Sequence, residues 1–208
     1  MNITEAIHAR RTVRDFQDRP VDRPILERIV DAGLQAPSND HLRAWEFVVV
    51  DEPARRLELL AKVRREFPEE EVASWLDSWG SADPVQRAMY LDGVPKQHRM
   101  LLTAGTLLVP CFRQASPLLQ PKCLSDLNGF ASIWCCIENM LLAAAAEGIF
   151  GVTRIPFPAE LTHIKQTLGI PPDYEVACYL ALGHPAPNAA RPHQLAACAK
   201  ERIRLEHW

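Results

Sequence analysis

The sequence has no apolar run long enough to cross a bilayer and no mark of a secreted protein. No hydrophobic stretch reaches the roughly 18 to 20 residues that span a membrane. The opening residues, MNITEAIHARR, lack the order of positive charge, apolar core and small-residue cleavage site that defines a secretory signal. We therefore expect a cytoplasmic protein with no membrane partner.

Cysteine pairs are also missing. None of the six cysteines belongs to a CxxC pair, and no histidine stands at a zinc-finger spacing from any of them. We expect no metal site. We expect the thiols to be reduced and mostly buried, as small hydrophobic side chains, at Cys111, Cys123, Cys135, Cys136, Cys178 and Cys198.

An excess of positive charge is absent as well. The chain has 23 Lys and Arg against 26 Asp and Glu, which gives a net charge of −3. A domain that binds the phosphate backbone of nucleic acids is usually basic, so we expect no nucleic-acid partner. With 208 residues, of which 48% are hydrophobic and 24% charged, the chain can bury one sizeable core. We expect one domain over residues 1–208.

The common signatures of catalysis do not occur. The sequence contains neither a GxGxxG nor a GxxxxGK[ST] loop, and it contains no GxSxG or HExxH motif. It therefore offers polar recognition groups without an obvious nucleophile or base. This combination is typical of a protein that holds a cofactor with its own redox chemistry.

Helix and strand patterns alternate along the chain without a repeat or a linker. Helical spacing predicts a short helix over 2–11 capped by Asn2, a helix that starts at Asp22 and ends before Pro37, an exposed amphipathic helix over 54–67, and one or two short helices within 68–100. Apolar runs predict strands over 45–53, 104–114 and 174–185. Residues 125–151 are apolar nearly all round and predict a central buried helix, and residues 193–205 predict a short charged helix. This order favours an α+β or α/β fold.

Two polar clusters stand out against this background. RRTVRDF, residues 10–16, has three arginines and a threonine within five positions, which suits a phosphate monoester because guanidinium forks match phosphate oxygens. The same stretch fits a solvated, salt-bridged helix end equally well. APSNDHLRAWEFVVV, residues 36–50, places polar side chains between a helix and a buried strand, as a binding loop or a capped turn would.

The order of these segments resembles a known family. Residues 7–50, IHARRTVRDFQDRPVDRPILERIVDAGLQAPSNDHLRAWEFVVV, resemble the opening of the nitroreductase-like FMN-dependent oxidoreductases, whose pattern is RRSxRxF, PV, a helix and APSxxNxQPWxFxVV. ENMLLAAAAEGIFG (138–151) is similar to the central helix of that family, and LGIPPDYEVACYLALGHP (168–185) to one of its strands. Only residues 52–105, roughly, are unmatched. The resemblance implies a central mostly antiparallel sheet flanked by helices, an intertwined homodimer, and two FMN sites at the dimer interface.

The resemblance also implies which residues bind FMN. The RRSxR pattern, which holds the FMN phosphate and the flavin edge, falls on Arg10, Arg11, Thr12 and Arg14. The segment that reaches the flavin from the partner subunit falls on Pro37, Ser38 and Asn39. The loop after the central helix, Val152–Ile155, falls where a backbone amide meets flavin N5, which implies contacts from Thr153, Arg154 and Ile155.

A further basic residue that completes the phosphate site falls near Arg191, although Ala189 stands where a Lys is expected. Other departures lie in the second cluster, where His41 replaces Asn, Arg43 replaces Gln and Ala44 replaces Pro. Arg43 would make the flavin environment more positive and raise the flavin potential, whereas His41 is either a flavin contact or a packed loop histidine. Arg154 replaces an apolar residue and is expected either to reach an anionic substrate or to pair with an acid at the surface.

The function that the resemblance implies is transfer of a hydride from NADH or NADPH to FMN and then reduction of a small organic acceptor, such as a nitroaromatic, a quinone or an enone, in ping-pong order. No side chain is expected to act as a catalytic residue, since the flavin carries the chemistry. One alternative is a specialised flavin reaction, dehalogenation or flavin fragmentation, with residues 68–100 as a variable insert or lid. The aromatic side chains of that segment, Trp75 and Trp79, fit a lid, but the core of a dimer interface is the favoured interpretation. Another alternative is an FMN carrier or sensor without turnover. The C-terminal extension, 186–208, is expected to pack on the partner or on the core.

Overall fold

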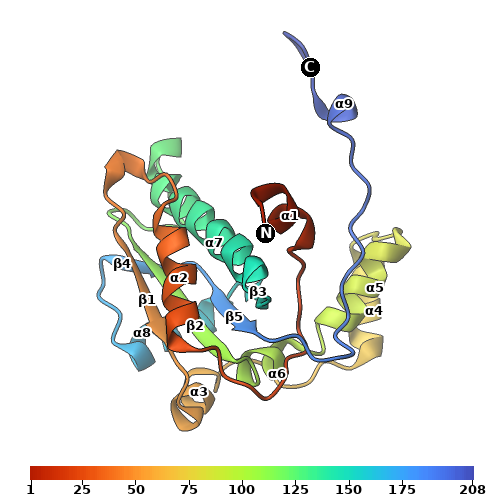
Figure 1. The fold of residues 1–208 in the computed structure, drawn as a ribbon, viewed down its shortest axis with the longest axis horizontal. Helices are drawn as coiled ribbons and strands as arrows, with labels where there is room; N and C mark the ends of the chain where they lie inside the picture. The colour runs from red at the N-terminus through yellow and green to blue at the C-terminus, as the bar shows by residue number, and fades with distance from the viewer.

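The centre of the molecule is an antiparallel sheet with helices on both faces (Figure 1). The computed structural model describes residues 1–208. Four strands lie in the order β1 (Trp45–Val49), β2 (Thr106–Arg113), β5 (Tyr179–Gly183) and β3 (Phe150–Arg154), and β4 (Tyr174–Val176) pairs with β2. Each of these pairings is antiparallel. The predicted α+β class with a mostly antiparallel sheet is therefore confirmed.

The two faces of the sheet follow from the alternation of side chains along its strands. Leu108, Phe112, Leu180 and Leu182 lie on one face and pack against α2 (Arg23–Leu34) and α7 (Asn128–Ala146). The residues that alternate with them, such as Leu107 and Tyr179, lie on the other face and pack against α3 (Pro53–Leu59), α6 (Gln97–Leu102) and α8 (Pro158–Leu168). Because both faces are covered, β2 and β5 consist of nearly continuous apolar residues.

The remaining helical elements lie outside these two layers. They are α1 (Ile3–Ala9), α4 (Glu69–Ser78), α5 (Pro84–Gly93), α9 (Ala199–Arg202) and two single 3-10 turns, η1 (Asn39–His41) and η2 (Leu124–Leu127). Helices α4 and α5 stand to one side of the sheet (Figure 1) and share a small apolar cluster of their own, formed around Val72, Leu76 and Val94. Residues 68–100 thus contain two complete helices and the start of α6.

The strand predicted over 174–185 is in fact two strands. Val176 and Leu180 are four residues apart in the sequence, whereas the β2 residues that pair with them, Cys111 and Leu108, are three residues apart. The extra residue is a β-bulge, and it lies opposite Pro110, which has no N–H to donate to a ladder.

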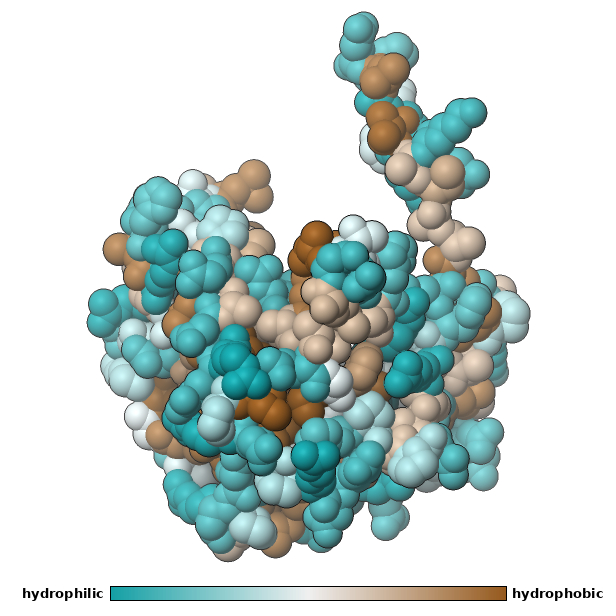
Figure 2. Space-filling model, in the orientation of Figure 1, coloured by the Kyte–Doolittle hydropathy of each residue, from teal (hydrophilic) through white to brown (hydrophobic).

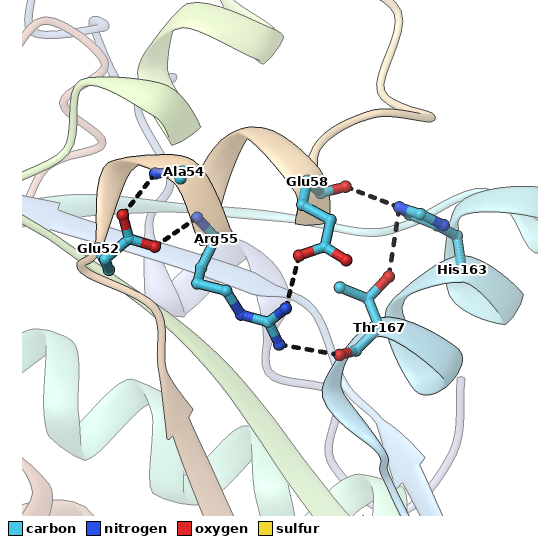
Figure 3. A network of polar contacts seen from close by, with 6 residues as sticks. All are labelled: Glu52, Ala54, Arg55, Glu58, His163 and Thr167. Carbon is cyan, nitrogen blue, oxygen red and sulfur yellow. Dashed lines mark hydrogen bonds and ion pairs between the residues drawn. The ribbon is translucent and has the colours of Figure 1, made fainter.

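The helix predicted over 54–67 ends early and is not fully exposed. Helix α3 stops at Leu59, and the chain then buries Leu60 and Val63 as it crosses to α4. Its first turn is capped by Glu52, whose carboxylate accepts hydrogen bonds from the backbone N–H of Ala54 and Arg55 (Figure 3). Arg55 also donates to the carbonyl of Thr167 at 3.2 Å, which ties α3 to α8.

The prediction for residues 125–151 was right in type but too long. The helix α7 covers 19 residues, and residues 150 and 151 belong to β3. By length and composition, Leu124–Ala146 is apolar enough to cross a membrane, which corrects the expectation that no such run exists. One side of α7 packs along α2 and the sheet through Ile133, Ile137 and Met140, while Cys135 stays exposed on the other side. Cys123 and Cys198 are exposed too, so only three of the six thiols are buried as expected.

The C-terminal segment leaves the body of the molecule as an arm (Figure 1). Only Ala199–Arg202 is helical, which corrects the helix predicted over 193–205. The arm carries apolar side chains that Figure 2 shows standing clear of the body, and Leu205 and Trp208 are 78% and 101% exposed. The arm therefore does not pack on the core of its own chain.

Candidate functional site

The arginine-rich stretch leaves α1 and runs beside β3. Helix α1 starts in a capping box formed by Asn2 and Glu5, and it ends at Ala9, with Arg10 as its C-cap. Thr12 then forms a parallel bridge with Gly151, and the N–H of Val13 donates to the Gly151 carbonyl at 3.1 Å. A glycine is needed here, because a Cβ at Gly151 would lie 2.3 Å from the carbonyl oxygen of Ala181. The arginines are thus fixed against an edge strand.

A basic basin lies between the end of α1 and the C-terminal segment. Its volume is about 360 Å³, and its wall consists of His8, Ala9, Arg11, Arg191, Pro192, His193 and Gln194. The wall contains no acidic residue. Arg11 is held in place by donating to the carbonyls of His8 and Arg10, both at 2.7 Å, and Arg191 lies over the ring of Phe150 at 5.0 Å. This arrangement concentrates positive charge around one open site.

An apolar cavity of about 570 Å³ lies on the other side of the arginine stretch. Residues from α5, α6 and the end of β3 line it together with Arg14: Met89, Tyr90, Gly93, Val94, Gln97, Met100, Val152, Thr153, Arg154, Ile155, Pro156 and Phe157. Burial lowers the pKa of Arg14 even though Asp92 and Asp15 act in the opposite direction. Arg14 is therefore a poorly solvated cation at the edge of an apolar space.

A mainly apolar slot lies between the two cavities and shares wall residues with each. The slot is about 410 Å³ and lies between α5 and the C-terminal segment. It shares Met89 with the apolar cavity, and it shares Arg191, Pro192 and His193 with the basic basin. The three hollows thus form a row with the slot in the middle; Arg11 lines the hollow at one end and Arg14 the hollow at the other.

Ion pairs hold α5 and α6 against the arginine stretch. Asp15 accepts hydrogen bonds from Lys96 at 2.7 Å and from Arg99 at 2.6 Å. Lys96 also donates to Asp92 at 2.5 Å. Burial alone would lower the pKa of Lys96, but its bonds to Asp15 and Asp92 outweigh burial and raise it. One wall of the apolar cavity is thereby attached to Arg14 and Asp15.

Arg154 is not at the surface and is not free to reach a substrate. It forms two hydrogen bonds with Glu160, and the two residues are 5% and 3% exposed. Its Nε donates to Gln97 at 2.9 Å. The prediction of an acid partner was right, but the expected surface location was wrong, because Glu160 lies in the first turn of α8 facing β3. The pair fixes the turn that follows β3.

Residues 153–155 also correct the predicted loop. Thr153 and Arg154 are the last two residues of β3 and pair with Leu180 and Tyr179 on β5. Only Ile155 lies beyond the strand, and it is 58% exposed. The strand was missed because FGVTR is short and directly follows the long helix. All three residues nevertheless line the apolar cavity, next to Arg14.

The second predicted cluster lies elsewhere on the chain. Ser38, Asn39 and Arg43 line a separate polar hollow of about 310 Å³ next to the start of α7. Pro37 and His41 are exposed in the same connection between α2 and β1. In Figure 1 this connection, in orange, lies on the side of the molecule away from α4 and α5. The fold of one chain therefore brings Arg10–Arg14, Thr153–Ile155 and Arg191 together, but not residues 37–43.

The connection is conformationally strained. Asp40, His41 and Arg43 have φ values of 51°, 54° and 43°, in the left-handed region that side-chain-bearing residues seldom occupy. Ser38 stabilises it by accepting from the N–H of Arg43, and Ser132 accepts from the N–H of Asn39, each at 3.1 Å. The Nε of Arg43 donates to the carbonyl of Leu34 at the end of α2. Such strain concentrates at functional sites.

Several residues of the site were not predicted from the sequence. His8 and His193 flank the predicted arginines, yet no motif marked them. Gln97 and Glu160 set the position of Arg154 from segments that the motifs did not cover. Pro158 at the start of α8, Glu160 in its first turn and Gly169 at its end were signals that could have located the helix.

Comparison with known proteins shows which family the chain matches. The profile of the nitroreductase family matches residues 7–184. A protein of Methanothermobacter thermautotrophicus that carries the provisional name NADH dehydrogenase/NAD(P)H nitroreductase is 27% identical, with 100% of this chain and 88% of the relative covered. An iodotyrosine deiodinase of Haliscomenobacter hydrossis is 26% identical, with 88% of this chain and 79% of the relative covered.

A solved structure supports the same fold. It is a variant of the nitroreductase NfnB from sphigopyxis sp. strain HMH, described as dependent on FMN and NADPH. It superposes with a TM-score of 0.74 at 20% identity, with 100% of both chains covered. Because the family profile covers most of the sequence, the resemblance seen in the motifs is confirmed. The chain belongs to the nitroreductase family.

Proposed function

We propose that the protein is an FMN-dependent oxidoreductase that uses NADH or NADPH to reduce a small organic acceptor such as a nitroaromatic, a quinone or an enone. The observation that carries the proposal is the row of hollows that runs from the apolar cavity through the slot to the basic basin. Bound FMN would supply the redox chemistry, taking a hydride from the nicotinamide and reducing the acceptor in a second step. No protein nucleophile is required.

The residues present fit FMN at both ends of the row. The basic basin offers Arg11 and Arg191 without an opposing acid, as a phosphate dianion requires. The apolar cavity falls within the range of about 300 to 1,000 Å³ that holds small molecules and cofactors. Arg14 would face the edge of the ring system, and Arg10 and Thr12 would add donors near the phosphate. Thr153, Arg154 and Ile155 would line the ring.

The lining of the apolar cavity favours a neutral, flat acceptor. Tyr90, Ile155 and Phe157 offer apolar and aromatic surfaces, and Arg154 is already neutralised by Glu160. The wall contains no Asp or Glu that is free to bind an ammonium group. This supports reduction of a neutral acceptor over dehalogenation of an aromatic amino acid, the activity for which one relative is named.

Helices α4 and α5 would form a cover over this cavity. They share a small apolar cluster that is separate from the two main clusters, and Tyr90 of α5 reaches the cavity. Trp79, which is 62% exposed, packs edge-on against Tyr90 at 5.8 Å. Trp75 belongs to the shared cluster instead, packed against Phe67. These contacts support the interpretation of residues 68–100 as a lid.

We infer a cytoplasmic homodimer in which residues 37–43 reach the site of the partner. Three observations support the dimer: the strained connection lies apart from the row of hollows, α7 leaves an exposed face at Ala131 and Cys135, and the C-terminal arm, residues 186–208, ends in exposed apolar side chains at Leu205 and Trp208. Burial of exposed apolar surface is the main favourable term in such association. Pro37, Ser38, Asn39, His41 and Arg43 would then complete the flavin site.

A visible absorption spectrum of the purified protein is the first test. We expect flavin bands, release of FMN identified by mass, and bleaching when NADH or NADPH is added without oxygen. Bleached protein should recover its colour when a quinone or nitroaromatic is added. A colourless protein that binds no added FMN would refute the proposal, and flavin bands that neither nucleotide bleaches would indicate a carrier.

A pair of variants tests the site itself. Arg11→Met combined with Arg191→Met should remove most bound FMN, because each residue supplies a charge-assisted contact worth about 1.5 to 3 kcal/mol. Arg23→Met is the matched control, since Arg23 pairs only with Glu27 on the surface of α2. Retention of FMN in the double variant would show that the phosphate lies elsewhere.

A further inference from the structure

The basic basin contains two histidines that the family motifs do not cover. His8 lies in the last turn of α1, and His193 lies two residues after Arg191. Both line the same hollow as Arg11 and Arg191, so four basic side chains from two segments surround one space of about 360 Å³. The Lys expected near Arg191 is Ala189, which leaves one fixed charge fewer in that segment.

The charged residues around these histidines lie on several elements. Arg11 faces them from the stretch after α1, and Arg191 from the C-terminal segment. Asp92 of α5 lies in the slot beside His193, but it is already bound to Lys96 at 2.5 Å. Glu138 of α7 is paired with Arg10 at 3.5 Å. Both of these acids are thus paired with other cations, and Glu5 of α1 is bound to the N–H of Asn2, so an anion entering the basin meets net positive charge.

We infer that His8 and His193 are binding residues for the phosphate of FMN, and that their protonation makes the retention of FMN depend on pH. This inference rests on the proposed function. It goes further because it assigns two residues and a pH response that neither the motifs nor the relatives supply.

The sign of the pH response follows from linkage. A phosphate monoester loses its second proton near a pKa of about 6, so the dianion predominates above that pH. Free histidine has a pKa of about 6.5, and a bound dianion stabilises the charged ring. Above about pH 6.5, binding must therefore take up protons, and affinity falls as the pH rises. Fixed arginines alone would give an affinity that rises slightly as the remaining monoanion is lost and then stays constant.

The test is a titration of apoprotein with FMN, followed by quenching of flavin fluorescence, at about pH 6.5 and about pH 8.5. For the wild type we expect the Kd to rise by about fivefold or more between these values, up to tenfold per pH unit for each proton taken up. His8→Gln with His193→Gln should bind more weakly at the lower pH and change by less than about twofold. His163→Gln, in α8 and bonded to the Glu58 carbonyl, is the matched control and should behave as wild type.

Riboflavin, which lacks the phosphate, separates the basin from the rest of the site. Its affinity should not change with pH in either protein, and the double variant should bind it as the wild type does. FMN affinity in the double variant that changes with pH as in the wild type would overturn the inference while leaving the proposed function intact. Failure of the wild type to bind either flavin at any pH would overturn both.

Discussion

The guanidinium of Arg14 lies directly against the backbone of Gly93. A Cβ placed on Gly93 would come within 2.9 Å of Cζ and 3.0 Å of Nε of Arg14. Gly93 has an ordinary helical backbone, so its value here is the space it leaves rather than its conformational freedom. Because Gly93 of α5 has no side chain, the guanidinium of Arg14 can occupy this position at the edge of the apolar cavity.

Gly93→Ala should displace Arg14 at little cost to the fold, because the group that must move is the end of a flexible side chain. We expect FMN to bind several-fold more weakly while the free energy of unfolding changes by less than about 1 kcal/mol. Flavin fluorescence and urea unfolding measure the two effects. Gly80→Ala is the opposite case: its φ is +66° with nothing within 4 Å, so it should lose about 1 kcal/mol of stability and keep its FMN affinity. Equal FMN affinity in Gly93→Ala and wild type would contradict the role given to Arg14.

The buried pair of Arg154 and Glu160 should be sensitive to removal of one partner and tolerant of removal of both. Glu160→Gln leaves a buried guanidinium without its counterion, which should cost about 3 to 5 kcal/mol in urea unfolding. Arg154→Leu together with Glu160→Leu removes the uncompensated charge and should recover most of that loss. Glu27→Gln, which breaks the exposed pair with Arg23, should change stability by less than about 1 kcal/mol. A double variant no more stable than Glu160→Gln would contradict this account.

Much of the fold could be predicted because local patterns and tertiary structure agree. The cap at Asn2, the start of α2 at Asp22 and the apolar run of β2 all lie where the sequence predicted them. The bulge between β4 and β5 could not be predicted, because its cause, Pro110, lies on the neighbouring strand. The early end of α3 has a similar origin, since burial of Leu60 and Val63 against the sheet layer overrides helical periodicity.

The candidate site was predictable where it coincides with a motif. Arg11, Arg14 and Arg191, which the motifs singled out, line the row of hollows, and their contact with FMN stays a prediction. The partner of Arg154 was not predictable, because Glu160 meets it only through the turn from β3 into α8. His193 was missed for a related reason: its proximity to His8 comes from the path of the C-terminal segment past α1, which no spacing encodes.

Arg56 and Arg55 are neighbours in α3 that should differ sharply in their effect on stability. Arg56 is 6% exposed and donates to the carbonyls of Val50, Leu102 and Ala104 and to the carboxylate of Asp51. Arg56→Met removes the donor from the three carbonyls, while Asp51 keeps its hydrogen bonds from Thr106 and Leu107, and should cost about 2 to 4 kcal/mol. Arg55 lies in the exposed network of Figure 3, so Arg55→Met should cost at most about 1 kcal/mol. Equal losses in urea unfolding would show that the buried contacts of Arg56 add nothing.

His98 should make the apoprotein less stable as the pH falls. Burial lowers its pKa in the folded protein, and the positive charges of Arg65 and Arg154 add to the effect. The unfolded chain therefore binds a proton first, near pH 6.5, and the free energy of unfolding decreases from there toward the lower pKa of the folded state. Urea unfolding at about pH 7.5 and about pH 5.5 covers this window.

His98→Gln cannot take up the proton and should lose less stability than the wild type over that interval. His184, whose pKa is also lowered by burial and by Arg19, leaves part of the pH dependence in place. His207→Gln, in the exposed arm, is the control and should retain the full wild-type loss. The carboxylates with lowered pKa values, such as Glu71 and Glu147, titrate below this window, so they do not obscure the comparison. An identical loss in His98→Gln and wild type would mean that the folded protein accommodates the charged ring beside Arg154 at no cost.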